Sequence, residues 1–132
     1  MIGNRLPAHS TGSGKALLAF LPREVVDGIL RRYGMAARTP KTVTDPDALF
    51  RELDRVRELG YARDDEEHEE GVRCIAVPVR DASGQVVASL SISGPAARLS
   101  DDRVESVIPE LLESGQKLST RLGHAPEPAH AR

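Results

Sequence analysis

Two β-rich segments, residues 72–80 and 85–93, carry small or hydroxyl-bearing side chains at alternate positions. The sequence Asp81-Ala82-Ser83-Gly84 between them is typical of a hairpin turn. Pairing the segments across Ala82-Ser83 gives an aliphatic face with the pairs Val79–Val86, Val77–Ala88 and Ile75–Leu90. The opposite face has the pairs Cys74–Ser91, Ala76–Ser89 and Val72–Ser93. This second face could form the polar floor of a cavity, be covered by a large side chain from a helix, or be exposed to solvent. Residues 86–93 carry no charge, which favours the cavity.

The segment Ser10-Thr11-Gly12-Ser13-Gly14-Lys15-Ala16 is a second candidate site. It is not a phosphate loop, because that motif needs glycine where His9 stands and serine or threonine where Ala16 stands. Glycines allow a ligand to approach the backbone closely, and free N–H groups at a helix start favour an anion. Gly12, Ser13 and Gly14 could therefore hold a carboxylate. Tight helix packing explains the same glycines equally well.

Three further groups have residue types that could do chemistry. The acidic run at residues 64–70 could bind a metal or transfer protons, although a solvated loop is the commoner arrangement. Cys74 could be a nucleophile or a small core residue, and only His68, six residues earlier, offers a nearby base. Zinc ligands could come from His9, His68, Asp64 and Cys74, but their spacing is not that of a zinc site. We therefore expect no cofactor or metal.

Helical and alternating hydrophobic periods follow one another along the chain and predict the elements that must position these residues. Helices are expected over residues 10–20, 22–34, 45–60 and 100–122, and strands over residues 61–63, 72–80 and 85–93. Residues 35–44 are expected to form a polar linker. The second helix is expected to bury Val25, Val26, Ile29, Leu30 and Tyr33, and the last helix to turn Val104, Val107, Ile108, Leu111, Leu112 and Leu118 inward.

Length and composition restrict the class of protein. The 132 residues suit one domain, and 39% hydrophobic with 29% charged residues indicate a soluble globular chain. A net charge of −2 and only 3% aromatic residues give no sign of a nucleic-acid surface in this segment. No apolar run is long enough to span a membrane, and the first residues do not resemble a secretory signal. Cys74 is the only cysteine, which fits a reducing cytoplasm.

Three segments occur in a characteristic order: LPAHSTGSGKALLAFLP, TVTDPDALFRELDRVRELGYARDDEEHEEGVRCIAVPV and SLSISGPAARLS. Together they resemble the effector-binding domain of IclR-type bacterial transcription regulators, from Leu6 to about Gly123. The resemblance implies an α/β (α+β) fold of the GAF/profilin type, in which helices flank an antiparallel sheet. It also implies a cytoplasmic sensor that binds a small organic molecule, expected to be a carboxylate, and alters DNA binding by an attached winged helix-turn-helix domain.

The resemblance further implies which residues bind the ligand. They are Gly12, Ser13, Asp64, Cys74, Ser91 and Ser93. These residues coincide with the small polar hairpin face, so we expect a cavity above it, with Ser91 and Ser93 on the same side as Cys74. Asp64 is expected to point inward, because several like charges are costly to bury together. Its acidic neighbours are then expected to be exposed, namely Asp65, Glu66, Glu67, Glu69 and Glu70.

Residues 1–123 are expected to form one effector-binding domain that lacks the DNA-binding domain and the first strands, and residues 124–132 a disordered tail. The resulting open sheet edge predicts a homo-oligomer, either a dimer or a tetramer. DNA contact is expected only through the missing N-terminal domain, with no membrane contact and no enzymatic activity. Two alternatives stay open: an oligomerisation or interaction module with a vestigial pocket, and an enzyme that uses Cys74 with His68 or His9.

Overall fold

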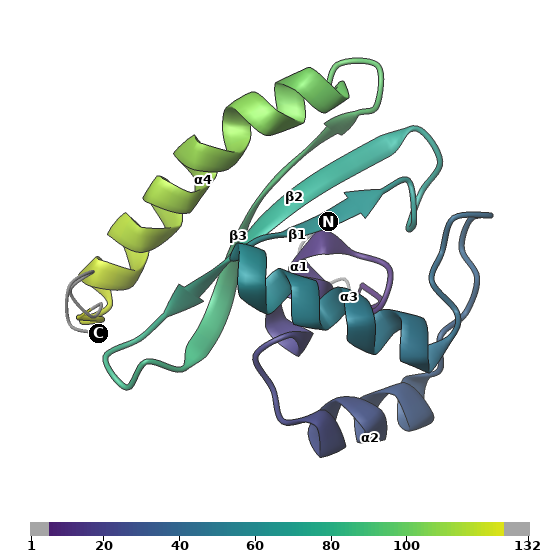
Figure 1. Cartoon of the computed structure of the whole chain (residues 1–132), viewed down its shortest axis with the longest axis horizontal. Helices are drawn as coiled ribbons and strands as arrows, with labels where there is room; N and C mark the ends of the chain where they lie inside the picture. Colours follow the sequence, from purple (N-terminus) through teal and green to yellow (C-terminus); the bar gives the residue numbers. More distant parts are fainter. Residues whose placement is uncertain (1–5, 126–132) are drawn as a thin grey trace.

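The structure is a computed structural model that describes residues 6–125 (Figure 1). In chain order its elements are α1 (Gly12–Leu18), α2 (Arg23–Tyr33), α3 (Pro46–Leu59), β1 (Ala62–Asp65), β2 (Val72–Arg80), β3 (Val86–Pro95) and α4 (Asp101–Arg121). The strands form one antiparallel sheet in the order β1-β2-β3. Helices flanking an antiparallel sheet confirm the predicted α+β class. Most of the tail predicted to be disordered, residues 126–132, lies outside the described residues.

The helix ends lie close to the predicted positions because local side chains satisfy their backbone groups. The N-caps are Thr11 of α1, Asp45 of α3 and Ser100 of α4, and each side chain accepts a backbone N–H of the first turn. Gly60 ends α3 in the left-handed conformation, with φ of +82°. Strand β1 begins one residue later and ends two residues later than predicted, so it includes Asp64. None of the four described helices has the length and apolarity needed to cross a bilayer.

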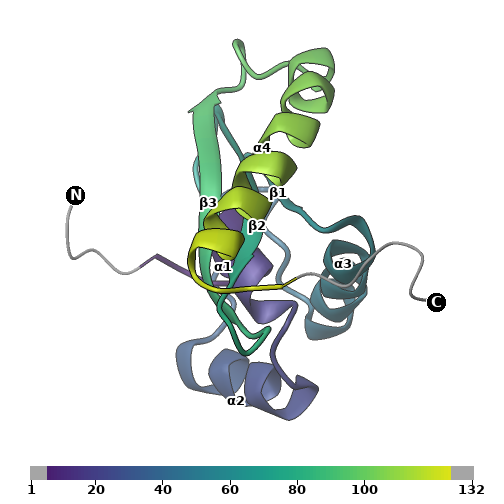
Figure 2. The same cartoon turned by 90° about the vertical axis from the view of Figure 1, so that its left-hand side faces the viewer.

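The sheet separates two hydrophobic clusters, because successive β2 side chains point to opposite faces. Ala76 lies in the cluster with α1, α2 and α3, whose largest buried members are Leu18, Leu30, Leu49 and Leu53. Ile75 and Val77 lie in the other cluster, with Val104, Ile108 and Leu111 of α4. In Figure 1, α4 runs along the sheet on the side away from α2 and α3. Figure 2 shows α2 at the lower end of the molecule and α4 along its upper part.

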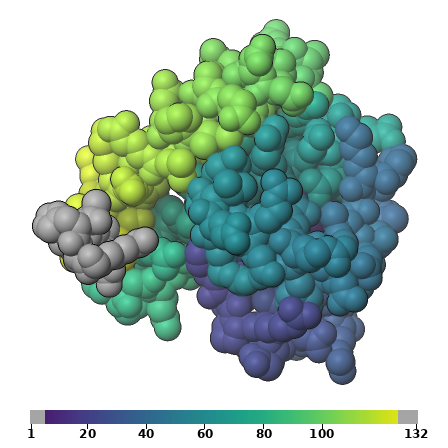
Figure 3. All heavy atoms as spheres, viewed as in Figure 1, coloured from purple at the N-terminus to yellow at the C-terminus, as the bar shows by residue number. Residues whose placement is uncertain are grey.

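The helices bury narrower stripes than the sequence predicts. In α2, Val26 and Leu30 are buried, whereas Val25 and Tyr33 are exposed. In α4, Leu118 near the C-terminal end is also exposed. Each of these helices packs on the domain with only one side, so residues at the borders of the predicted apolar faces remain in solvent. The outer face of α3 is likewise open to solvent between α4 and α2 (Figure 3).

The hairpin register differs from the predicted one by two residues over most of its length. Cys74 is opposite Ser93, Ala76 opposite Ser91 and Val77 opposite Leu90. One residue of the shift comes from the turn, which has three residues and is closed by the Asp81 N–H donating to the Gln85 carbonyl at 3.1 Å. The second comes from a bulge between the Val79 and Arg80 pairs. Because the two irregularities sum to an even number, the side chains beyond the bulge, including Cys74, Ser91 and Ser93, keep their predicted faces. Val86 lies between the turn and the bulge and is opposite Arg80, not Val79 as predicted.

Candidate functional site

Five of the six predicted ligand-binding residues meet around Cys74. In the sheet, Asp64 of β1 is opposite Cys74, and Cys74 is opposite Ser93 of β3. Ser91 lies two residues before Ser93 and therefore on the same face, as predicted. Gly12 of α1 lies directly above, so close that a Cβ atom there would be 3.1 Å from the Cys74 Sγ. The predicted residues from four separate segments thus form one cluster.

The face predicted to be a cavity floor is covered over β2 and open over β3. Gly12 is buried against the Cys74 side chain, and Ser13 beside it is half-buried in the first turn of α1. Ser91 and Ser93 are exposed, so their hydroxyl groups are accessible from solvent. The cluster therefore has a closed side formed by α1 and an accessible side formed by β3.

The structure favours packing, the second of the two explanations left open for the glycines of α1, over a three-amide anion site. A Cβ atom on Gly14 would lie 2.5 Å from the Ala8 Cα, which is closer than side chains tolerate. The Gly14 N–H also donates to the Thr11 hydroxyl at 3.1 Å, so it is already engaged as part of the helix cap. The Gly12 N–H faces the Cys74 thiol, so Ser13 is the member of the predicted group whose N–H remains a candidate for contact with a ligand.

The Cys74 thiol is buried and uncharged at neutral pH. Burial raises its pKa, and the negative charge of Asp64 raises it further. Hydrogen bonds from the Ser93 and Ser91 hydroxyls oppose this effect, as does the Gly12 backbone N–H. A thiol in this state supplies shape and a weak hydrogen-bond donor rather than a nucleophile.

Asp64 points inward, as predicted, and the residue is only 5% exposed. The carboxylate accepts the Glu67 backbone N–H at 2.8 Å. Burial raises the pKa of Asp64, while the Glu67 N–H and the positive charge of Lys15 act in the opposite direction. Asp64 is therefore a buried carboxyl beside Cys74 that takes up a proton at higher pH than a solvated aspartate does. The predicted exposure of Asp65, Glu69 and Glu70 is confirmed, whereas Glu66 is half-buried.

Glu67 contradicts the prediction that the rest of the acidic run is exposed, because it is only 7% exposed. Its carboxylate accepts hydrogen bonds from Lys15 at 2.9 and 3.1 Å, and Lys15 is itself fully buried. The sequence argument rested on the cost of burying like charges together and missed Lys15 as a counter-charge. A usable signal existed, since Lys15 occupies the same helical face as the buried Leu18 and Ala19.

The acidic turn that carries these carboxylates, residues 64–67, has an unusual backbone. Glu66 has φ of +59° and is the only non-glycine residue with positive φ within residues 6–125. The Thr39 hydroxyl donates to the Glu66 carbonyl and the Thr42 hydroxyl to the Glu67 carbonyl, both at 2.6 Å. The segment predicted as a polar linker therefore holds this turn, in keeping with the rule that a strained backbone persists only where the surrounding structure fixes it.

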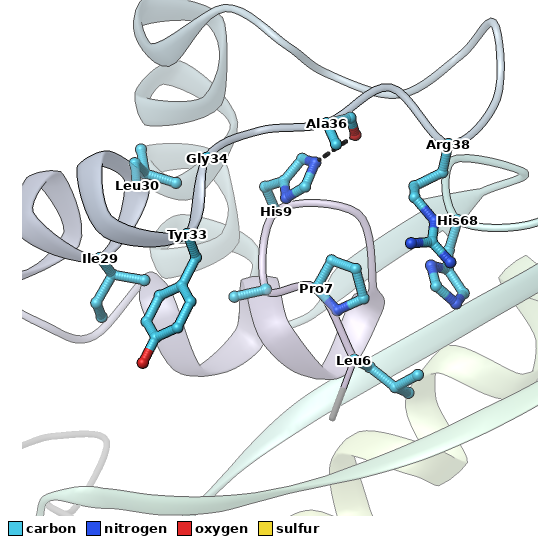
Figure 4. Close-up of a pocket in the computed structure, with 11 residues that line it drawn as sticks. Leu6, Pro7, His9, Ile29, Leu30, Tyr33, Gly34, Ala36, Arg38 and His68 are labelled. Carbon is cyan, nitrogen blue, oxygen red and sulfur yellow. Dashed lines mark hydrogen bonds between the residues drawn. The ribbon is translucent and has the colours of Figure 1, made fainter. Parts of the chain in front are cut away.

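A hollow of about 850 Å³ lies beside the acidic turn (Figure 4). Its walls come from residues 6–9, the C-terminal end of α2, the following loop and His68. His9 donates through Nε2 to the Ala36 carbonyl at 2.9 Å, and the His68 Nδ1 lies 3.4 Å from the Ser10 hydroxyl. The hollow shares no residue with the predicted cluster, although His68 directly follows the turn. Sequence reasoning missed it because four separate segments form its walls.

The residues considered for zinc do not gather around one point. Within residues 6–125, no three His, Cys, Asp or Glu side chains are arranged to hold a metal ion. The chemistry available at the cluster is therefore that of hydroxyl groups, a thiol and a buried carboxyl. Such groups bind and orient an oxygen-rich organic molecule through hydrogen bonds.

Comparison with known proteins places this geometry among transcriptional regulators. A family model described as bacterial transcriptional regulator IclR C-terminal matches residues 1–120. The HTH-type transcriptional regulator KdgR of Escherichia coli (strain K12) is 46% identical over 123 residues, covering 93% of this chain and 47% of KdgR. The HTH-type transcriptional repressor AllR of Klebsiella pneumoniae is 45% identical over 126 residues, covering 96% of this chain and 46% of AllR. The chain thus spans about half the length of these curated relatives.

Solved structures agree with this placement. The C-terminal domain of E. coli KdgR superposes with a TM-score of 0.86 at 46% identity, covering 94% of this chain and 76% of that one. A double mutant of the PobR inducer-binding domain from Acinetobacter, in complex with 3-hydroxybenzoic acid, gives 0.84 at 41% identity, covering 89% and 69%. IclR of Thermotoga maritima gives 0.87 at 38% identity, covering 94% and 50%. At these identities and TM-scores, this chain and the three solved structures share the same backbone fold.

Proposed function

This chain belongs to the family of bacterial transcriptional regulator IclR C-terminal domains, and we propose that it is the effector-sensing part of such a regulator. In this proposal it binds a small organic acid or a related metabolite and thereby modulates DNA binding by an attached winged helix-turn-helix domain. Such a sensor works in the bacterial cytoplasm, where a single free cysteine stays reduced. The observation that carries the proposal is the meeting of Asp64, Cys74 and the β3 serines beneath α1.

The accessible side of the cluster is where the ligand would bind. The exposed hydroxyls of Ser91 and Ser93 would donate to a carboxylate, and the backbone near Gly12 and Ser13 would line the same site. Asp64, with its raised pKa, would accept from a ligand hydroxyl or donate to a ligand oxygen when protonated. The PobR domain cited above was solved with 3-hydroxybenzoic acid, which carries both a carboxyl and a hydroxyl group, and this supports an acid as the ligand class.

A ligand changes the protein only if it binds two conformations with different affinity. The cluster joins α1, β1 and β3, so a ligand seated there contacts three elements whose relative positions define the domain's conformation. We propose that ligand binding selects one arrangement of these elements and that a homo-oligomer passes the change to the DNA-binding part.

Binding assays with small carboxylates test the proposal, with 3-hydroxybenzoate as the first probe. We expect Ser93→Ala to weaken binding of an active acid by about tenfold or more, because a donor to a charged acceptor is lost. Ser114→Ala on α4 is the matched control, since Ser114 is also exposed but lies on the opposite side of the sheet, and it should leave affinity unchanged. Absence of binding by every tested acid at millimolar concentration would favour an interaction module with a vestigial pocket.

The competing hypothesis of a Cys74-dependent enzyme makes a different prediction. A catalytic cysteine reacts quickly as a thiolate, whereas the burial of Cys74 raises its pKa and keeps it as a thiol. We therefore expect iodoacetamide to alkylate Cys74 in the folded protein at neutral pH at least about tenfold more slowly than in the urea-unfolded protein. Faster alkylation in the folded state would support the enzyme. Mass spectrometry of the single cysteine measures both rates.

A further inference from the structure

Lys15 is a fully buried charge that touches three parts of the domain. It lies on α1, and its ammonium group donates to the Glu52 carboxylate of α3 at 2.5 Å. The same ammonium group donates to both carboxylate oxygens of Glu67 in the acidic turn. A buried charge is tolerated only when it is paired in this way. One nitrogen atom therefore links α1, α3 and the acidic turn.

A short chain of hydrogen bonds leads from Lys15 to the candidate ligand site. The Glu67 carboxylate, held by Lys15, also accepts the Asp65 backbone N–H at 3.0 Å. The Glu67 backbone N–H in turn donates to the Asp64 carboxylate at 2.8 Å. The turn includes the left-handed Glu66, a conformation that must be held by its surroundings. Fixing the Glu67 side chain therefore fixes the direction of the Asp64 carboxylate.

We propose that Lys15 is a positioning residue of the effector site, which holds the acidic turn so that the Asp64 carboxylate faces Cys74 and the β3 serines. This inference rests on the function proposed above, because it assigns Lys15 a role at the same site. Lys15 does not line the accessible side of the cluster and need not touch the ligand. It acts through Glu67.

Charge balance explains why a lysine suits this position. Lys15 faces the carboxyl groups of Glu52, Glu67 and Asp64, and its positive charge lowers the pKa of Asp64 against the effect of burial. For stability alone, an apolar side chain of similar volume usually serves as well as a buried ion pair. The lysine instead specifies where the carboxylates lie, which an apolar side chain cannot do.

The test uses the ligand-free protein and the Lys15→Met substitution, which keeps the chain length and removes the charge. We expect hydrogen exchange at the Asp65 and Glu67 amides to accelerate by about tenfold or more, because the turn opens locally. In a carbon-13 NMR titration, the Asp64 carboxyl should also titrate at higher pH than in the wild type. Val26→Ala is the control, because it removes core volume in α2 without touching the turn, and both readouts should stay unchanged.

Unchanged exchange at the two amides in Lys15→Met, together with an unchanged Asp64 titration, would overturn the proposal and leave Lys15 a purely structural residue. If Lys15→Met does not fold, Glu67→Gln cuts the same ion pair from the turn side. The position-67 amide must then exchange about tenfold faster than in the wild type, and wild-type exchange would again overturn the proposal. No effector is used, so a failure of every acid to bind would contradict the proposed function without affecting this result.

Discussion

Among single residues of the candidate ligand site, Asp64 is the one whose burial most clearly costs stability. Burial raises its pKa above the ordinary value of 3.8, and the pKa of Glu67 is raised from 4.5 for the same reason. A carboxyl whose pKa is higher in the folded state than in the unfolded state stabilises the fold at pH values below its unfolded-state pKa. That contribution is lost as the pH rises through the folded value. Both groups therefore make the fold less stable at neutral pH than at acidic pH, and for Asp64 this cost is consistent with the binding role proposed above.

We predict that Asp64→Asn stabilises the fold at neutral pH by about 1 kcal/mol, the scale typical of relieving a costly functional residue. The amide oxygen can still accept the Glu67 N–H, while the charge that opposes burial is gone. Urea unfolding at about pH 7 and about pH 4 measures the gain, which should shrink at the lower pH, because a carboxyl with a raised folded pKa takes up its proton in the folded state before it does so in the unfolded state. Asp65→Asn is the control, because Asp65 is exposed. An equal destabilisation by Asp64→Asn at both pH values would contradict the prediction.

The sequence predicted the positions of some residues of the candidate site and missed those of others. Cys74, Ser91 and Ser93 were placed correctly, because period-two alternation dictates the face of a strand side chain. Lys15 and Glu67 were missed, because their pairing joins residues 52 positions apart and depends on where α1 lies against the acidic turn. Sequence patterns report which side of an element a residue occupies. They do not report which charge from another element will meet it.

At the scale of elements, the β2–β3 hairpin shows the same distinction. The expected strands were found, but the pairing was shifted by two residues, because neither the longer turn nor the bulge has a unique signature in the sequence. The faces of Ser91 and Ser93 were predicted correctly because the longer turn and the bulge together shift the pairing by two residues, an even number. A single irregularity would have turned Ser91 and Ser93 toward α4 and removed the candidate site.

The contact between α4 and the sheet offers a matched pair of glycine substitutions. A Cβ atom on Gly115 of α4 would lie 2.8 Å from the Val77 Cγ2, whereas a Cβ atom on Gly28 of α2 would meet nothing within 4 Å. We predict that Gly115→Ala destabilises the fold by about 1 kcal/mol or more through overpacking. Gly28→Ala should stabilise it by about 0.5–1 kcal/mol, because alanine favours helix. Thermal and urea unfolding check both signs, and stabilisation by both variants would show that α4 packs less closely than described.

At the scale of the whole molecule, the candidate ligand site lies at the open edge of the sheet. Among residues 6–125, β3 pairs only with β2, so its other side presents unpaired backbone groups. Ser91 and Ser93 belong to this same strand. Edge strands of this kind commonly pair with another chain unless a charge or a proline blocks them, and β3 has no charge and only a terminal proline. A ligand at the serines and a partner at the edge would therefore influence one another.

We predict that the protein self-associates through this edge and that Ile92→Lys makes it monomeric. A lysine on an edge strand disfavours pairing with a second strand. Ile92 is 37% exposed, so the charge can reach solvent without disturbing the core.

Leu118→Lys is the control, because Leu118 has nearly the same exposure, 38%, but lies on α4. Light scattering over a range of protein concentrations should give at least a dimer mass for the wild type and Leu118→Lys, and a monomer mass for Ile92→Lys. A monomeric wild type would show that the edge recruits no second copy, and loss of association in Leu118→Lys alone would move the interface to α4.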